Sequence, residues 1–307
     1  MKTTHFAFTG SDNKILPAVL WQPEKVRAVL QVVHGTTEHM GRYETFASIM
    51  ASHGIAVAGF DLRGHGKNPG DPEVAAFVPG DWQASVAEVQ LFREHLQREF
   101  PDVPQFLLGF SLGSFLVRDL LNTYPTDTLA GVILMGTGHQ PGWLLSVMRK
   151  IVAGQIKKVG FHQPSALVRK LSFGMYNDKF KPNRTDVDWL STNETALDDY
   201  LADPLVRRHT SAGLFWELLG SMKRHSSPKE YTQWDKSLPI LLISGEEDPV
   251  GNAGKGVTLI HRQMKNAGMN NVTLKLLPNV RHALLLGNIE DTAKIIAQWL
   301  TKLTCST

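Results

Sequence analysis

The chain alternates short apolar runs with longer amphipathic stretches. Six runs are almost continuously apolar, as strands buried on both faces of a sheet are, and they cover residues 28–33, 55–60, 105–110, 131–135, 240–243 and 272–277. Five stretches place apolar residues every three or four positions, which is the period of a helix with one buried face, and they cover residues 43–53, 81–100, 112–124, 257–267 and 289–303. This alternation predicts an α/β fold with a mainly parallel sheet and helices on both of its faces.

The first residues of the chain follow a different pattern. Residues 4–23 alternate apolar and polar positions, and Gly10, Ser11, Asp12 and Asn13 interrupt the alternation. Residues of these types favour turns, so the stretch predicts a β-hairpin with one face in water. We expect this hairpin to form an antiparallel edge of the sheet.

The alternation of strands and helices stops between about residues 138 and 237. This stretch contains several amphipathic helical segments but no convincing buried strand, and the strand pattern resumes at residue 240. Structureless loops of such length are rare in compact domains, so the stretch predicts an inserted helical cap. We expect residues 1–137 and 238–307 to form an α/β core, and residues 138–237 to cover the carboxyl edge of its sheet, where such sheets bind ligands.

Composition narrows the class of protein. The chain has 307 residues, of which 42% are hydrophobic and 20% charged, as in ordinary globular proteins, and its net charge of +3 is too small by itself to support binding to nucleic acid. A single cysteine, Cys305, excludes an internal disulfide framework and a cysteine-based zinc site. Because the first residues lack the apolar run of a signal peptide and no apolar stretch reaches about 18 residues, we expect a cytoplasmic protein that does not span a membrane.

A candidate nucleophile lies in the sequence Gly109-Phe110-Ser111-Leu112-Gly113, between a predicted strand and a predicted helix. In this context the G-x-S-x-G pattern indicates a turn so tight that the two flanking glycines cannot carry side chains. Such a turn lifts the serine hydroxyl clear of the sheet and places the N–H of Leu112 at a helix N-terminus, where it can stabilise a developing oxyanion. The pattern also occurs by chance in loops, so this interpretation depends on a base and an acid elsewhere in the chain.

The two further groups that a serine nucleophile needs are a base and an acid that orients the base. Asp248 and His282 each follow a predicted strand, which places both at the same edge of the sheet as Ser111. Glu247 is the main alternative to Asp248 as the acid. Asp248 is preferred because Pro249 stiffens the loop directly after it and because its shorter side chain has fewer rotamers to immobilise.

Two longer motifs accompany these residues. One is His-Gly-Thr-Thr-Glu-His-Met-Gly-Arg-Tyr at residues 34–43, and the other is Asp-Leu-Arg-Gly-His-Gly at residues 61–66. Together with the serine motif and the Asp248 and His282 loops, they resemble the monoacylglycerol lipase and lysophospholipase group of the α/β-hydrolases, and segments 188–191 and 200–205 are similar to cap segments of bacterial members. The resemblance implies an α/β-hydrolase fold, the chain order Ser…Asp…His, no cofactor, and a second oxyanion N–H from Thr36.

Most polar residues of these motifs are expected to hold the oxyanion loop through ion pairs and hydrogen bonds rather than to take part in the chemistry. They are Glu38, His39, Arg42, Asp61, Arg63 and His65. A metal site built from His34, His39 and His65 is not expected, because their spacing fits no helical ligand pair. Lys67 and Asn68 occupy the turn in which the group usually has a serine, a departure that affects the shape of the loop rather than the candidate catalytic residues.

The predicted cap has two features that bear on the substrate. Residues 143–159 combine apolar side chains with four basic ones, so this segment is expected to lie on an anionic membrane surface or to pack as an ordinary cap helix over a pocket, and a cap helix can do both. The four basic residues are Arg149, Lys150, Lys157 and Lys158. Apolar residues that can line a tunnel for one acyl chain are Trp143, Leu144, Leu145, Phe161, Leu167, Leu171, Phe173, Phe215, Trp216 and Leu218.

The sequence therefore predicts a serine hydrolase that cleaves carboxylic esters of single-chain lipids, with membrane-surface contact through the cap as an open question. A serine peptidase or an acyltransferase could use the same three residues, and a non-catalytic binding protein is a second class of function on this fold. Dehalogenases and epoxide hydrolases are disfavoured because they would need a carboxylate at position 111, where the chain has Ser111.

Overall fold

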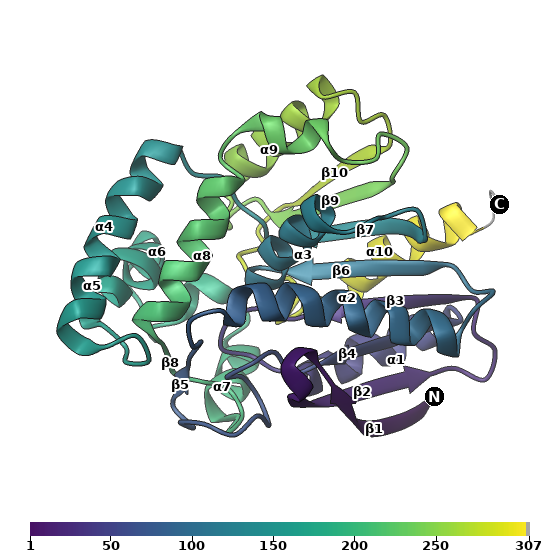
Figure 1. The fold of residues 1–307 in the computed structure, drawn as a ribbon, viewed down its shortest axis with the longest axis horizontal. Helices are drawn as coiled ribbons and strands as arrows, with labels where there is room; N and C mark the ends of the chain where they lie inside the picture. The colour runs from purple at the N-terminus through teal and green to yellow at the C-terminus, as the bar shows by residue number, and fades with distance from the viewer. Residues whose placement is uncertain (305–307) are drawn as a thin grey trace.

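The computed structural model describes residues 1–304, so Cys305 lies outside the described part of the chain. Its centre is an eight-stranded sheet with the order β1-β2-β4-β3-β6-β7-β9-β10 (Figure 1). The strands are β1 (Lys2–Thr9), β2 (Ile15–Gln22), β3 (Ala28–Val33), β4 (Ile55–Phe60), β6 (Gln105–Phe110), β7 (Leu129–Met135), β9 (Ile240–Gly245) and β10 (Val272–Leu277). Only the β1–β2 and β2–β4 pairs are antiparallel, so the predicted mainly parallel sheet and its antiparallel hairpin are confirmed.

Helices cover both faces of this sheet. Figure 1 shows α2 (Asp81–Glu99) in front of the sheet and α1 (Glu44–Ser52) and α10 (Ile289–Thr304) behind it. The front face also carries α3 (Leu112–Thr123) and α9 (Lys255–Asn266), whose apolar side chains share one core with those of α2. The five predicted helices are therefore present, with ends that differ from the predicted ones by at most a few residues.

The continuous apolar character of the inner strands follows from this arrangement. In β3, Val29 and Val33 pack into the front core, whereas Leu30 and Val32 pack into the core behind the sheet. Successive side chains of a strand point to opposite faces, so a strand covered on both sides is mostly apolar. The exception in β3 is Gln31, which is buried and donates to the Val89 carbonyl. The prediction that residues 272–277 are buried on both faces is wrong, because β10 is the last strand of the sheet and Lys275 is exposed.

Between β7 and β9 the chain forms mostly short helices. The longest are α4 (Gly142–Val159) and α8 (Ala212–Arg224), which pack against each other. The shorter elements are α5 (Ala166–Arg169), a π-helical turn (Lys170–Gly174), α6 (Met175–Asn177), α7 (Glu194–Ala202) and 3-10 turns at Asp178–Phe180, Asp188–Leu190 and Pro228–Thr232. Figure 1 shows α4, α5 and α8 beyond the end of the sheet to which the arrow of β6 points, which is the carboxyl edge.

One strand within this region was not expected. β8 (His209–Thr210) pairs in parallel with β5 (Val74–Ala75), a strand that lies in the loop before α2. Each strand has two residues, which is too short for a periodic pattern to appear in the sequence. The pair joins the helical region to a loop of the α/β part of the chain. The division into a core and an inserted cap stays a prediction.

Candidate active site

Ser111 lies at the tight turn between β6 and α3 that the sequence predicts. Its backbone has φ of 49° and ψ of −114°, a conformation that non-glycine residues rarely adopt. A Cβ at Gly109 would lie 2.5 Å from the carbonyl oxygen of Gly113, and a Cβ at Gly113 would lie 2.0 Å from that of Val33. Both distances are far below van der Waals contact. Glycine at both positions therefore allows the strand and the helix to approach closely enough for this turn.

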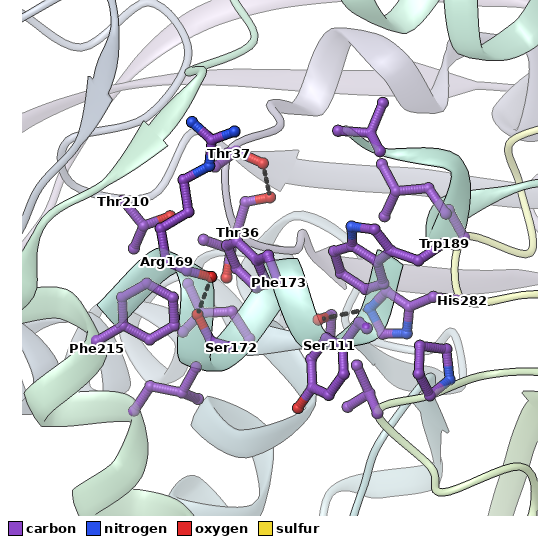
Figure 2. A pocket seen from close by; sticks show the side chains of 18 of the residues that line it. Thr36, Thr37, Ser111, Arg169, Ser172, Phe173, Trp189, Thr210, Phe215 and His282 are labelled. Carbon is purple, nitrogen blue, oxygen red and sulfur yellow. Dashed lines mark hydrogen bonds between the residues drawn. The ribbon is translucent and has the colours of Figure 1, made fainter. Parts of the chain in front are cut away.

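Three side chains meet in a chain of short contacts at this turn. The Nε2 atom of His282 lies 2.9 Å from Oγ of Ser111 (Figure 2). Its Nδ1 atom lies 2.9 Å from Oδ1 of Asp248. Ser111 follows β6, Asp248 follows β9, and His282 follows β10. These strands are parallel, so their carboxyl ends lie at one edge of the sheet and bring together side chains that are distant in the sequence.

The carboxylate of Asp248 is fully buried and held by two donors. The Ser244 hydroxyl donates to Oδ2 at 3.1 Å, and the backbone N–H of Val250 donates to Oδ1 at 2.8 Å. The neighbouring Glu247 points elsewhere: its side chain is 42% exposed, and its carboxylate lies 3.7 Å from Arg281. Of the two candidate acids, only Asp248 contacts His282.

The His282 ring lies against aromatic side chains from two parts of the chain. Phe110 of β6 has its ring centre 5.1 Å away, and Trp189 is stacked on the imidazole at 5.0 Å with an angle of 25° between the rings. Two hydrogen bonds to backbone carbonyls join the same segments. The Ala283 N–H donates to the Leu190 carbonyl, and the Arg281 guanidinium donates to the Asp188 carbonyl. Sequence reasoning missed the contact of Trp189. The only signal for it was the similarity of residues 188–191 to cap segments.

Thr36 and Leu112 line the same cavity as Ser111. Leu112 is the first residue of α3, and the first N–H groups of a helix have no partner within the helix. Thr36 follows β3 in a loop that a neighbouring carboxylate holds, since Oε1 of Glu38 accepts hydrogen bonds from Gly35 N–H at 2.6 Å and from the Tyr43 hydroxyl at 2.8 Å. Burial raises the pKa of Glu38.

The polar residues of the two longer motifs contact one another or the backbone. Nε2 of His34 accepts from Leu62 N–H, and burial lowers the pKa of this histidine to about 3, so it is neutral near pH 7. Asp61 accepts from the N–H groups of Met40 and Lys67. His39 and Arg42 both bind Asp203, and Arg63 binds the carboxylates of Asp12, Asp81 and Glu88. Asn68 donates to three backbone carbonyls, including that of Asp61. The ring of His65 contacts the Arg63 carbonyl. Across residues 1–304, no group of three or more metal-ligating side chains is arranged to hold an ion.

A cavity of about 680 Å³ lies over Ser111 and is lined mainly by apolar side chains. Of the residues expected to line a tunnel, Leu144, Leu145, Leu171, Phe173, Phe215 and Leu218 do so. The expectation is wrong for two tryptophans: Trp143 is 71% exposed, and Trp216 lies under the guanidinium of Arg149. Phe161 packs against Gly213, and Leu167 is exposed, so neither of them lines the cavity. Figure 2 shows Phe173, Phe215 and Trp189 around the space above Ser111.

Comparisons with known proteins agree with this geometry. Residues 24–288 match the model of a hydrolase family described as serine aminopeptidase, S33. The chain is 28% identical over 280 residues to a monoglyceride lipase of Mus musculus, a match that covers 90% of this chain and 82% of that protein. It is 26% identical over 282 residues to a monoacylglycerol lipase of Mycolicibacterium smegmatis, with 90% and 89% covered. A solved carboxyl esterase from Bacillus coagulans superposes with a TM-score of 0.86 at 24% identity, and 99% of each chain is covered.

The sheet and its flanking helices form the α/β-hydrolase fold, in agreement with the family match and the solved esterase. Within that class, the chain belongs to the hydrolase family described as serine aminopeptidase, S33. The predicted resemblance to monoacylglycerol lipases and the predicted class of serine carboxylic-ester hydrolase are confirmed.

Proposed function

We propose that this hydrolase cleaves carboxylic esters of single-chain lipids, such as monoacylglycerols or lysophospholipids, through an acyl-enzyme on Ser111. The observation that carries the proposal is the apolar cavity of about 680 Å³ that lies directly over the Ser111 hydroxyl. A cavity of this size and character buries an acyl chain while the ester group lies at the serine. The names of the monoglyceride and monoacylglycerol lipases that the chain resembles support the same class of substrate.

In the proposed mechanism, the Ser111 hydroxyl donates to Nε2 of His282 and then attacks the acyl carbonyl as His282 takes its proton. The Nδ1–H of His282 donates to Asp248, which keeps Nε2 free to accept that proton and stabilises the imidazolium. His282 then protonates the leaving alcohol. Water then attacks the acyl-enzyme with His282 again as the base. The bond between the acyl carbon and Ser111 Oγ breaks, His282 returns the proton to Oγ, and the free acid leaves. No cofactor takes part in these steps.

We further propose that the backbone N–H groups of Thr36 and Leu112 stabilise the oxyanion of the tetrahedral intermediate. Both residues line the cavity beside Ser111, and Leu112 adds the positive end of the α3 helix dipole. The two donors come from loops after adjacent strands, because β3 and β6 are paired in the sheet.

We propose that residues 138–237 form a cap over the core formed by residues 1–137 and 238–307. Most apolar residues that line the cavity above Ser111 belong to this segment, including Leu145, Phe173 and Phe215. In this arrangement the cap determines the length and shape of the acyl chain that fits, while the core supplies the three reacting side chains.

We expect monoacyl esters to be good substrates and triacylglycerols to be poor ones, because one cavity of about 680 Å³ accommodates one chain. Burial of each CH₂ group contributes about 0.8 kcal/mol, so kcat/KM should rise by up to about fourfold for each CH₂ from acetyl to medium-chain esters. The measurement is a chain-length series of p-nitrophenyl esters beside monoacylglycerols, lysophospholipids and triacylglycerols under identical conditions.

Other outcomes of this series would each replace the proposal. A preference for acetyl esters would indicate a small-ester esterase, and a preference for triacylglycerols a true lipase. Faster cleavage of aminoacyl amides would favour a peptidase, in line with the description of the matched family.

The exposed face of α4 has the composition of a helix at a membrane surface. Four exposed residues of α4 follow one another at spacings of four, three and seven positions, which places them on one face of the helix: Trp143, Val147, Lys150 and Lys157. Lys158 is exposed beside them. Arg149 does not belong to this face, because its guanidinium lies 3.9 Å from the ring centre of Trp216. We propose that this face contacts anionic lipid surfaces.

A triple replacement of Lys150, Lys157 and Lys158 by glutamine is expected to weaken binding to vesicles that contain phosphatidylglycerol by roughly tenfold or more, because each basic residue near such a surface contributes about 1 kcal/mol. Hydrolysis of a soluble ester should not change. Glutamine at Lys2, Lys25 and Lys294, which are exposed lysines of the predicted core, removes the same charge as a control. Equal binding by the two triple variants would leave α4 with a packing role only.

Within residues 1–304, no helix combines the length and the apolar character needed to cross a bilayer.

A further inference from the structure

The loop that carries Thr36 contains a strained residue. Thr37 has a φ of 69°, in the left-handed region that β-branched residues rarely adopt. Such a conformation persists where the surrounding structure holds it from several sides, and it is common near active sites. The contacts that hold Thr37 therefore bear on the geometry of the neighbouring Thr36 N–H.

Two of these contacts come from the proposed cap. The backbone N–H of Arg207 donates to the Thr37 carbonyl at 2.8 Å, and the hydroxyl of Tyr200 lies 2.8 Å from that of Thr37. The Thr37 hydroxyl itself donates to the Thr36 carbonyl at 2.5 Å. Because that hydroxyl has one proton, Tyr200 is the donor to Thr37. The resulting chain of hydrogen bonds runs from the Tyr200 hydroxyl through Thr37 to the backbone of Thr36.

Tyr200 is well suited to a fixed donor role. It is buried at the cavity wall, Arg42 stacks on its ring at 4.8 Å, and Arg42 and His39 both bind Asp203 on the same segment. Burial raises the pKa of Tyr200 to about 12, so the phenol keeps its proton throughout the pH range of ester hydrolysis.

The two ends of the Thr36 loop are thus held by different groups. Glu38 accepts from the N–H of Gly35, and the Tyr200–Thr37 pair binds the carbonyl of Thr36. The peptide group that carries the Thr36 N–H lies between these two anchors. The carbonyl of the same peptide, Gly35 O, accepts from Nδ1 of His34 at 2.8 Å. Loss of the Tyr200–Thr37 anchor therefore leaves this peptide held mainly from the Gly35 side, and the direction of the Thr36 N–H becomes less well defined.

We propose that Tyr200 is a positioning residue of the oxyanion hole, whose hydroxyl orients the Thr36 N–H through Thr37. This inference rests on the proposed function, because it requires Thr36 to be an oxyanion donor. It assigns to the cap a part in the chemical step in addition to binding of the acyl chain. Figure 2 shows Thr36 and Thr37 close to Ser111 in the cavity.

Tyr200→Phe is expected to lower kcat by about tenfold, less than the roughly 10²-fold or greater loss that removal of an oxyanion donor causes, and to change KM by less than about twofold. The inhibition constant of a long-chain alkyl trifluoromethyl ketone should rise by about the same factor. This inhibitor forms a hemiketal oxyanion with a serine, so its affinity reports on the oxyanion hole. A loss of protein stability alone would not change that affinity.

Tyr124→Phe is the matched control, because Tyr124 follows α3 and packs against the core away from the cavity. Thr37→Val removes the relay hydroxyl but keeps the β-branched shape, and Thr37→Ser keeps the hydroxyl. We expect Thr37→Val to lower kcat by about as much as Tyr200→Phe does. The double variant that combines Tyr200→Phe with Thr37→Val should be no less active than either single variant. Thr37→Ser should retain activity.

An unchanged kcat and inhibition constant in Tyr200→Phe would overturn the proposal, as would a rise in KM alone, which would make Tyr200 a substrate contact. Equal losses of kcat in Tyr200→Phe and Tyr124→Phe would also overturn it. Additive losses of kcat when Tyr200→Phe is combined with Thr37→Val would do the same. None of these outcomes touches the proposed ester hydrolysis, which the Ser111→Ala variant and the ester series test separately.

Discussion

Replacement of Ser111 by alanine is expected to lower kcat for ester hydrolysis by at least about 10⁴-fold, because loss of a serine nucleophile also makes its base ineffective. The variant should fold, since alanine removes one hydroxyl and leaves the turn between Gly109 and Gly113 unchanged. The measurement is hydrolysis of a medium-chain p-nitrophenyl ester, together with labelling by a fluorophosphonate and the melting temperature.

Two comparisons make this result specific. Ser52→Ala, on the exposed side of α1, should leave activity and labelling unchanged, because its hydroxyl contacts only the Ile49 carbonyl. His282→Ala should match Ser111→Ala, and the double variant should be little worse than either, because the two residues act as a unit. Activity of Ser111→Ala within about tenfold of the parent would refute the assignment. Absence of fluorophosphonate labelling in the parent protein would instead favour a non-catalytic binding protein.

Asp248→Asn is expected to lower kcat by on the order of 10³–10⁴-fold. An asparagine amide that donates to Nδ1 of His282 would favour the tautomer with a proton on Nε2, and that nitrogen could then not accept the proton of Ser111. The size of Asp and Asn is the same, so the cavity should keep its shape.

Glu247→Gln is the matched control for this prediction. Its partly exposed carboxylate lies 3.7 Å from Arg281, and exposed ion pairs contribute little, so kcat should stay within about twofold of the parent. Steady-state kinetics of both variants on one ester provide the test. A large loss in Glu247→Gln with little loss in Asp248→Asn would identify Glu247 as the acid.

Much of the fold can be read from local patterns because the causes are local. The apolar runs at residues 28–33, 55–60 and 105–110 coincide with β3, β4 and β6, since strands covered on both faces are mostly apolar along their whole length. The turn at Ser111 was equally accessible, because its steric requirement is met by the glycines two positions away on either side. The exception, β10, shows the limit of this signal: a run of apolar residues does not reveal that a strand has a neighbour on one side only.

The choice between Glu247 and Asp248 as the acid depends on more than local patterns in the sequence. Both residues precede Pro249 in one loop, and the sequence placed that loop at the correct edge of the sheet. Which carboxylate faces His282 depends on the backbone path, since Ser244 and Val250 hold Asp248 inward while Arg281 lies beside Glu247 outside. Residue chemistry supported the preference for Asp248, but the contact of Asp248 with His282 is a property of the folded loop.

The sequence by itself determined the class of fold, the serine turn and the order of the three candidate catalytic residues, because each depends on short-range periodicity or on the steric limits of a few adjacent residues. Only the tertiary structure decided that Trp189 stacks on His282 and that Tyr200 binds Thr37. The latter two residues are separated by 163 positions, and no local pattern encodes which side chains of an irregular helical segment meet a loop of the sheet. Those contacts arise when the helical segment packs over the carboxyl edge, so they depend on the path of the whole chain rather than on any stretch of it.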